Sequence, residues 1–288
     1  MKPLLIIAAF IIGGVFPQLG ELRWLIRYLL MLMLYLVFLQ LDVRQISVRR
    51  SHFLLLGFEI VFAVGCYWFF NALGCKALAE AAFFTAVTPT ATAAPVIIRF
   101  LGGNANYVVT AFVVTNFGIT AVLMWLLPWL ICGKSDLQMF LHTACNLLVL
   151  VAVPALLAAL TRKVWAASVQ LPGKLTKFSF LMWVVLLCII SGASSEFIRN
   201  NHDISPGVLL ATAVVSLIIC AVNFFVGGCI DRKFKSEASQ SCGQKNTSFT
   251  IVLATTFVSP LAAMGPTFYV LWHNLWNAAQ LFLHDRKK

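Results

Sequence analysis

The sequence predicts an all-α membrane protein, and three observations carry that prediction. Of the 288 residues, 61% are hydrophobic and only 11% are charged, and the mean hydropathy is +0.91. Soluble domains are about half apolar and about a quarter charged, so a chain of this length has no core that hides so much apolar surface. The apolar residues fall into ten segments that we interpret as transmembrane helices. Two of these segments are interrupted, at equivalent places in the two halves of the chain.

The ten segments are joined by short polar connections. They comprise residues 3–17, 22–41, 53–73, 77–101, 106–131, 137–160, 175–193, 207–230, 239–257 and 260–283. The first lacks a small-residue cleavage site after its apolar stretch, so we expect a retained helix rather than a signal peptide. Most of the 21 basic residues lie at the termini or after even-numbered segments. The positive-inside rule then predicts cytoplasmic N- and C-termini in a multi-pass protein of the cell membrane, either a bacterial inner membrane or a plasma membrane.

The fourth and ninth segments are the interrupted ones. Residues 88–95 read TPTATAAP, and each proline removes a backbone donor and clashes with the preceding turn. Residues 241–248 read SCGQKNTS, a polar run with a lysine inside an apolar segment. Each break lies in the fourth of five segments, and five is an odd number. The halves 1–131 and 132–288 are therefore predicted to be inverted repeats, an arrangement in which paired breaks indicate a transporter's binding site.

Residues 242–282 resemble the last two helices of the bile acid:sodium symporter family. That family shows Glu-x-Gly-Met-Gln-Asn, then a proline, then Trp-His-Asn, and the matching residues here are Gly243, Asn246, Pro260, Trp272, His273 and Asn274. Residues 89–95 are similar to the family's Pro-Gly-Gly-Thr-Ala-Ser-Asn. The resemblance implies a single transporter unit over 1–288 in which the broken helices cross. It also implies a core domain of about 53–131 and 207–283, a panel domain of about 3–41 and 137–193, and an organic anion bound between them.

The resemblance also implies two sodium ions behind the crossing, and here the sequence departs from the family. Ser241 stands at the position of the family's sodium-binding glutamate and Lys245 at that of its glutamine. The first motif ends in Ala94 and Pro95, and an ungapped alignment puts Val108 and Phe112 where the family has hydroxyl ligands. Sodium requires oxygen donors, which most of these side chains lack. We therefore expect no usual sodium site and no cofactor, with Lys245 standing in for one ion and sodium or a proton left open as the coupling ion.

Glu59 is the expected partner of Lys245. Glu59 is six residues past Phe53 and Lys245 is seven past Ala238, so both lie about 9–10 Å inside the cytoplasmic edge of their segments. An unpaired charge at that depth costs about 2.5–3.5 kcal/mol or more, which pairing would relieve. Two interpretations stay open: a pair that replaces sodium, permanently or as a proton-coupled switch, and a fixed salt bridge that only holds the crossing together.

The start of a half-helix presents free N–H groups and a positive dipole end to an anion. The predicted substrate-binding residues are Thr92, Asn246 and Lys245. The predicted ion-coupling residues are Lys245, Glu59, Ser241 and Gln244, and the supporting residues are His273, Asn274, Pro89 and Pro95. No metal site of the zinc type and no catalytic residue is predicted.

These features predict a secondary transporter that moves a small organic anion, a carboxylate or sulfonate resembling a bile acid or pantoate, by alternating access. The alternatives are a sodium-coupled organic anion symporter, a cation/proton antiporter that uses Glu59 and Lys245, and a sensor that binds its ligand without transport. An enzyme is disfavoured because HExxH, Walker and nucleophile-elbow motifs are absent from the sequence. The net charge of +11 does not predict nucleic-acid binding, because no run of five or six basic residues occurs. The substrate and the oligomeric state are left open.

Overall fold

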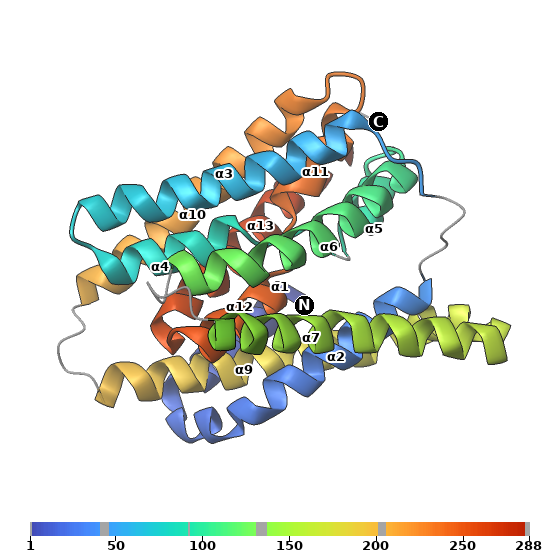
Figure 1. The fold of residues 1–288 in the computed structure, drawn as a ribbon. Coiled ribbons are helices and arrows are strands. Elements are labelled where there is room, and N and C mark those ends of the chain that lie inside the picture. Colours follow the sequence, from blue (N-terminus) through green and yellow to red (C-terminus); the bar gives the residue numbers. More distant parts are fainter. Residues whose placement is uncertain (1, 41–45, 92, 131–136, 201–205, 286–288) are drawn as a thin grey trace. The chain divides into compact units, whose positions relative to one another are not determined.

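The computed structural model describes residues 2–40, 46–91, 93–130, 137–200 and 206–285. These residues form helices and short connections, with no β-strand in the described ranges (Figure 1). Every predicted segment coincides with a helix or, for the two interrupted segments, with a pair of helices. Three of the described helical stretches are long and apolar enough to cross a membrane: Arg50–Ala72, Ala105–Pro128 and Pro206–Ile230. The chain is therefore an all-helical membrane protein, while ten crossings, inverted repeats and cytoplasmic termini stay predictions.

The chain divides into two compact units. Unit 1 comprises Met1–Asp42 and Thr120–Asn200, and unit 2 comprises Val43–Ile119 and Asn201–Lys288. The resemblance assigns nearly the same segments to the panel and core domains, except that it places 120–131 in the core. The roles of the two units as transporter domains stay a prediction.

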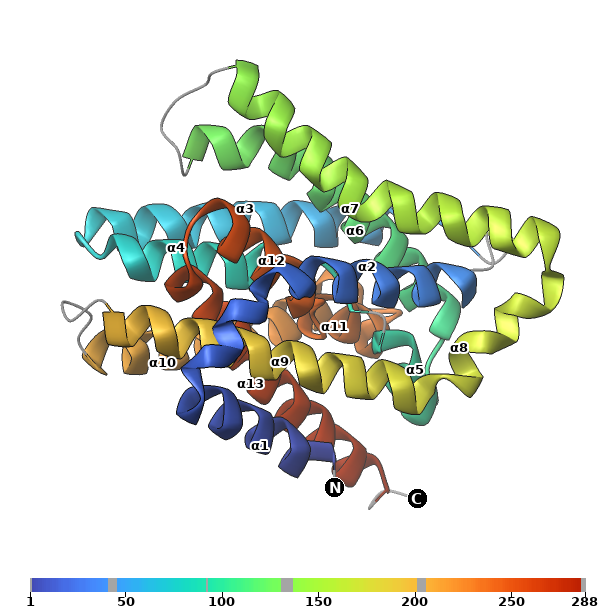
Figure 2. The ribbon, with the colours of Figure 1, turned by 90° about the horizontal axis from the view of Figure 1, so that it is seen from below.

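Unit 1 is built around close contact between its first and last helices. Its elements are α1 (Lys2–Val15), η1 (Pro17–Leu22), α2 (Arg23–Gln40), the second half of α6 (Ala105–Leu130), α7 (Leu137–Val164), η3 (Ala166–Gln170), α8 (Leu171–Lys174) and α9 (Thr176–Asn200). Helix α1 packs along α9 (Figure 2). Gly13 allows this approach, because a Cβ there would lie 2.4 Å from the carbonyl oxygen of Cys188.

The predicted segment 175–193 ends too early, since α9 continues to Asn200, into the stretch between the seventh and eighth predicted segments. The added turns are held to α1. Ser195 Oγ donates to the carbonyl oxygen of Gly14 at 2.8 Å, and Arg199 Nη2 donates to the same oxygen at 3.0 Å. Polar residues extend the helix here because α1 supplies the acceptor, which the local sequence does not reveal.

Unit 2 contains the two interrupted helices. Its elements are α3 (Arg50–Ala72), α4 (Lys76–Ala86), α5 (Ala94–Phe100), the first half of α6, α10 (Pro206–Ile230), α11 (Lys235–Gly243), α12 (Thr247–Phe257) and α13 (Pro260–Asp285). The fourth predicted segment is split into α4 and α5, and the ninth into α11 and α12. Pro89 follows the end of α4, where it cannot continue the helix. Pro95 is in the first turn of α5, where no intrahelical donor is needed.

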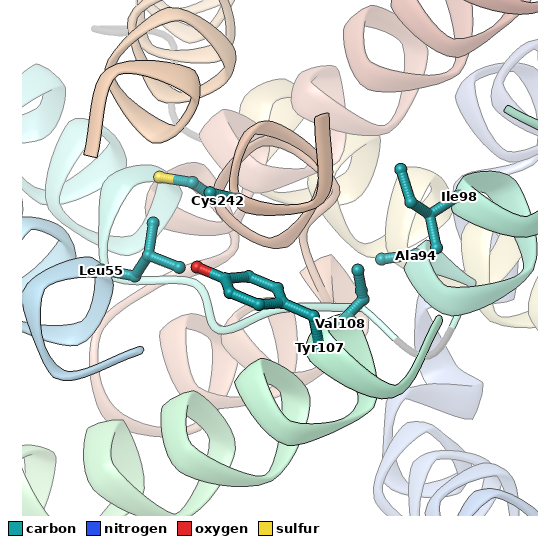
Figure 3. Close-up of a cluster of buried hydrophobic side chains, with 7 residues drawn as sticks. Leu55, Ala94, Ile98, Tyr107, Val108 and Cys242 are labelled. Atoms are coloured by element: carbon teal, nitrogen blue, oxygen red, sulfur yellow. The ribbon is translucent and has the colours of Figure 1, made fainter. Parts of the chain in front are cut away.

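An apolar cluster packs α3, α5, α6 and α11 against one another. Its buried members are Leu55, Ala94, Ile98, Tyr107, Val108, Ala238 and Cys242 (Figure 3). Ala94 and Val108 are 0% exposed in this cluster. Two of the positions that carry sodium ligands in the resembled family are thus parts of an apolar core in this chain.

Candidate functional site

The two breaks in unit 2 pair with each other through their backbones. Ala91 N donates to the carbonyl oxygen of Gln244 at 2.7 Å, and Asn246 N donates to that of Pro89 at 2.8 Å. Thr90 and Lys245 form an antiparallel bridge between these bonds. Backbone groups inside a bilayer have no water to bond with, so an interrupted helix persists there only when protein supplies the partners. Each break therefore supplies hydrogen-bond partners for backbone N–H and carbonyl groups that the other break leaves without a helical partner.

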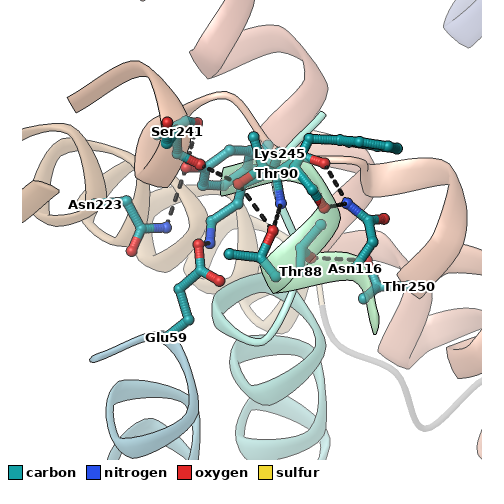
Figure 4. Close-up of polar contacts among 12 residues, drawn as sticks. Glu59, Thr88, Thr90, Asn116, Asn223, Ser241, Lys245 and Thr250 are labelled. Carbon is teal, nitrogen blue, oxygen red and sulfur yellow. Dashed lines mark hydrogen bonds and ion pairs between the residues drawn. The ribbon is translucent and has the colours of Figure 1, made fainter. Parts of the chain in front are cut away.

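Thr90 is held by hydrogen bonds from both its backbone and its side chain (Figure 4), and it is fully buried. Its hydroxyl donates to the carbonyl oxygen of Ser241 at 2.6 Å and accepts from the hydroxyl of Thr115 at 3.0 Å. Its N–H donates to Thr115 Oγ1 at 3.1 Å, and its carbonyl accepts from Asn116 Nδ2 at 2.9 Å. Helix α6 therefore holds the first break through Thr115 and Asn116. Sequence reasoning missed Thr115, and it assigned Asn116, a single polar residue in an apolar segment, only to contacts between helices.

The ion pair suggested by equal depth is present. Lys245 Nζ lies 2.6 Å from Glu59 Oε1, and both side chains are 0% exposed (Figure 4). Glu59 projects from the middle of α3, and Lys245 lies in the break between α11 and α12. Glu59 Oε2 is buried without a hydrogen-bond partner among the described residues. The Glu59 carboxylate thus neutralises the positive charge of Lys245 and contacts it through one oxygen. An unpaired charge in these surroundings is strongly disfavoured.

The other predicted ion-coupling residues do not join the pair. Ser241 Oγ donates to the carbonyl oxygen of Glu237 at 2.8 Å, within its own helix. Gln244 Oε1 accepts a hydrogen bond from Asn277 Nδ2 on α13. Their side chains are engaged elsewhere, so the structure brings together only Glu59 and Lys245 of the predicted set. The ammonium of Lys245 faces Glu59. A contact between Lys245 and the substrate stays a prediction.

A chain of amide side chains fastens the second break to α13. Gln240 Nε2 donates to Asn277 Oδ1 at 3.0 Å, and Asn277 in turn donates to Gln244. Gln240 and Asn277 are 0% and 4% exposed, respectively. Sequence reasoning missed both, since an isolated amide in an apolar helix does not show which neighbour it faces.

Of the predicted substrate-binding residues, Thr92 lies outside the described residues. Asn246 immediately precedes α12 and donates from Nδ2 to Asn116 Oδ1 at 3.3 Å. The first N–H groups of α12, at Thr247 and Ser248, have no intrahelical acceptor. Helix α5 has only seven residues, so its dipole is short. The backbone N–H groups without an intrahelical acceptor that are nearest Asn246 are therefore those at the start of α12, and anion binding there stays a prediction.

The predicted supporting residues separate into two groups. His273 is buried, and its ring lies edge-on to Tyr269 at 5.5 Å between centroids. The Tyr269 hydroxyl donates to the carbonyl oxygen of Gly243 at 2.8 Å, so His273 supports the last residue of α11 through Tyr269. Asn274 Nδ2 instead donates to the carbonyl oxygen of Val270 at 2.6 Å, within its own helix. The carbonyl of Pro89 accepts the N–H of Asn246, and Pro95 lies in the first turn of α5, where a proline fits the helix.

The donors at the crossing do not fit the two sodium sites of the resembled family. Ala94, Val108 and Phe112 are buried and carry no side-chain oxygen. The ammonium of Lys245 occupies the position of the family's glutamine. The positions that the resemblance assigns to one sodium site therefore carry no side-chain oxygen, and a position that it assigns to the other site carries Lys245.

In comparisons with known proteins, no family model and no curated protein matches this chain. The described fold and site define a class, that of all-helical membrane proteins with two interrupted helices joined at their breaks. Membership of the bile acid:sodium symporter family stays a proposal.

Proposed function

We propose that this protein is a secondary transporter that moves a small organic anion across the cell membrane by alternating access. The observation that supports this most is the reciprocal backbone pairing of the α4–α5 and α11–α12 breaks. Interrupted helices at corresponding places of two halves are the usual site of substrate and ion binding in transporters. A structural kink alone does not require two breaks that satisfy each other.

The proposed substrate carries a carboxylate or sulfonate group. The start of α12 offers N–H groups and a positive dipole end, and Asn246 and Asn116 add amide groups beside it. Glu59 neutralises the charge of Lys245, so among the described residues of the crossing no unpaired cation calls for a second negative charge on the substrate. A single negative charge matches these donors best.

The Lys245–Glu59 pair is proposed to replace sodium as the charge that stabilises the crossing. A covalently attached ammonium cannot dissociate, so transport on this scheme needs no sodium gradient. The same buried pair supports a second candidate, a cation/proton antiporter, because buried ionisable pairs in membranes commonly carry protons. In that case the transported species would be a cation, and no organic anion would accumulate.

Uptake into liposomes tests the proposal. The purified protein is reconstituted, and uptake of radiolabelled carboxylates and sulfonates is compared with that of empty liposomes. At least one acid is expected to enter the proteoliposomes faster than the empty liposomes, and Asn246→Ala is expected to reduce that uptake by more than about tenfold, the loss of one to two hydrogen bonds to a charged group. Asn71→Ala, which removes the same amide from an exposed residue at the end of α3, is the matched control. Acid-driven cation flux without anion uptake would favour the antiporter instead.

We expect sodium to have no specific effect on stability. The melting temperature of the protein in detergent is measured in sodium chloride and in potassium or choline chloride at equal ionic strength. A ligand that binds only the folded protein at 100 times its Kd adds about 2.7 kcal/mol, which such a measurement detects easily. A sodium-specific rise in the melting temperature would show that a sodium site exists. It would favour the alternative function, a sodium-coupled organic anion symporter.

A further inference from the structure

One end of unit 2 gathers the ends of the three helices that are long and apolar enough to cross a membrane. Helices α3 and α6 begin there, and α10 ends there. Tyr107 of α6 stacks on Phe234, which follows α10, with 5.0 Å between centroids. The Tyr107 hydroxyl donates to Ser51 Oγ of α3 at 2.9 Å. Figure 1 shows the start of α3 and the α10–α11 turn at the same end of the unit. Because three apolar spans stop together, this end lies at the level of the lipid headgroups.

Two cations are held on one aromatic ring at this end. The guanidinium carbon of Arg49 lies 4.7 Å from the centroid of Phe234, and Lys233 Nζ lies 5.7 Å from the same centroid. Both residues are exposed, and no carboxylate in the described ranges lies within ion-pair distance of either. We call Arg49, Lys233 and Phe234 the Phe234 cluster. Three further exposed basic residues flank it: Arg50, Arg232 and Lys235.

The nearby acidic residues accept hydrogen bonds from backbone N–H groups of the adjoining turns. Asp231 Oδ1 accepts the N–H groups of Lys233 and Phe234, both at 3.1 Å. Burial acts to raise the pKa of this carboxyl, but hydrogen bonds from Ser51 and from the two N–H groups outweigh it and hold the pKa below its usual value. Glu237 Oε1 accepts the N–H of Asn104 at 2.8 Å. Both carboxylates keep their negative charge while they hold the turns, and the five basic residues Arg49, Arg50, Arg232, Lys233 and Lys235 exceed these two by three charges, which leaves an excess of positive charge.

We propose that the Phe234 cluster binds the phosphate of an anionic lipid headgroup at the membrane surface. Arginine matches phosphate oxygens with two parallel donors, and lysine adds a point charge beside it. Basic clusters next to a membrane span attract anionic lipids by about 1 kcal/mol per residue. Phe53 and Leu54, in the first two turns of α3, are 59% and 49% exposed and offer an apolar surface near the cations for the acyl chains.

This assignment is independent of transport. It depends on the membrane spans, the ring contacts and the charges at one end of unit 2. Helix α11 begins at Lys235, next to the cluster, and ends at the second break. A lipid bound here therefore braces the outer end of the same half-helix whose inner end forms the crossing.

The test is a lipid titration of the purified protein in a neutral detergent. Phosphatidylglycerol, phosphatidylcholine with the same acyl chains, and soluble glycerol phosphate are added in separate series, and the melting temperature is recorded. Phosphatidylglycerol is expected to raise it by about 3 °C or more, as expected for about 1 kcal/mol of binding to a chain of this size. An equal rise with phosphatidylcholine would indicate a general lipid effect, and an equal rise with glycerol phosphate a site for soluble anions. Either result overturns the proposal.

Variants locate the effect on the protein. Arg49→Gln with Lys233→Gln is expected to abolish the rise, whereas Arg49→Lys with Lys233→Arg keeps both charges and most of the rise. Arg23→Gln with Lys76→Gln removes the same charge from exposed positions outside the cluster and is expected to leave the rise unchanged. If the glutamine double variant does not fold, Lys233→Gln alone, at an exposed position, is expected to reduce the rise by half or more. A full rise in these glutamine variants contradicts the assignment.

Discussion

Replacement of Glu59 by glutamine is expected to lower the free energy of unfolding by about 3–5 kcal/mol. The change leaves the ammonium of Lys245 buried without its counter-charge, which is the situation in which breaking a buried pair is most costly. For a chain of this length the melting temperature in detergent should fall on the order of 10 °C. Thermal unfolding followed by circular dichroism or intrinsic fluorescence measures this directly.

A second variant separates the pair's charge from its packing. Glu59→Leu combined with Lys245→Met removes both charges and keeps side chains of similar size, so it is expected to recover most of the lost stability. If Glu59→Gln alone melts like the unmodified protein, the ion pair contributes nothing to the fold. If the double variant is as unstable as the single one, the loss comes from packing rather than from an unpaired charge.

Glu59→Gln also distinguishes the two roles that the Glu59–Lys245 pair could have in transport, a permanent replacement for sodium and a proton-coupled switch. A permanent replacement for sodium predicts that Glu59→Gln reduces anion uptake at every pH by a similar factor. A proton-coupled switch predicts that it flattens the pH profile, since the group that exchanges the proton is gone. Retained uptake with an unchanged pH profile would eliminate the switch.

Gly265→Ala is expected to destabilise unit 2 by about 1–3 kcal/mol. A Cβ at this position of α13 would lie 2.4 Å from the carbonyl oxygen of Ala81 and 2.3 Å from Thr85 Oγ1, both on α4. Thr85 donates to that same carbonyl at 2.6 Å, so neither atom moves aside without breaking a buried bond. Overpacking of this kind costs about 1–3 kcal/mol.

Gly57→Ala is the matched control for Gly265→Ala. Gly57 lies in α3, and a Cβ there would meet no atom within 4 Å. Alanine is a better helix former than glycine by about 1 kcal/mol, so the control should melt at the same temperature as the unmodified protein or slightly higher. Equal losses in the two variants would contradict the close approach of α13 to α4.

The helix positions and the two breaks could be predicted from sequence because each has a local cause. Apolar length defines the helices, and Pro89, Pro95 and the polar run around Lys245 stand where a continuous helix in lipid is disfavoured. The Glu59–Lys245 pair was accessible by the same reasoning, since a charge at membrane depth needs a partner and the rise per residue put both at one level.

The hydrogen-bond partners of the crossing could not be predicted in the same way. Asn116 is a single amide in an apolar segment, and it is bonded to the carbonyl of Thr90 and to the amide of Asn246. Asn277 reaches Gln244 across more than thirty residues of chain. Which neighbour a polar side chain faces depends on how the helices rotate and approach, and that follows from packing of the whole unit. The resemblance that suggested Ser241 as an ion-coupling residue did not anticipate its bond within α11.

The mutual pairing of the breaks has a consequence for biosynthesis. Thr90 and Ser241, which bond across the crossing, are 151 positions apart. At 5–20 residues per second, the ribosome needs roughly 8–30 s to deliver the second after the first. During that interval the N–H of Ala91 and the carbonyl of Pro89 have no native partner, and bare lipid would penalise them by several kcal/mol per group. The nascent first break must therefore wait in the insertion machinery or in a wet, unassembled form, and unit 2 matures only when its last three helices arrive.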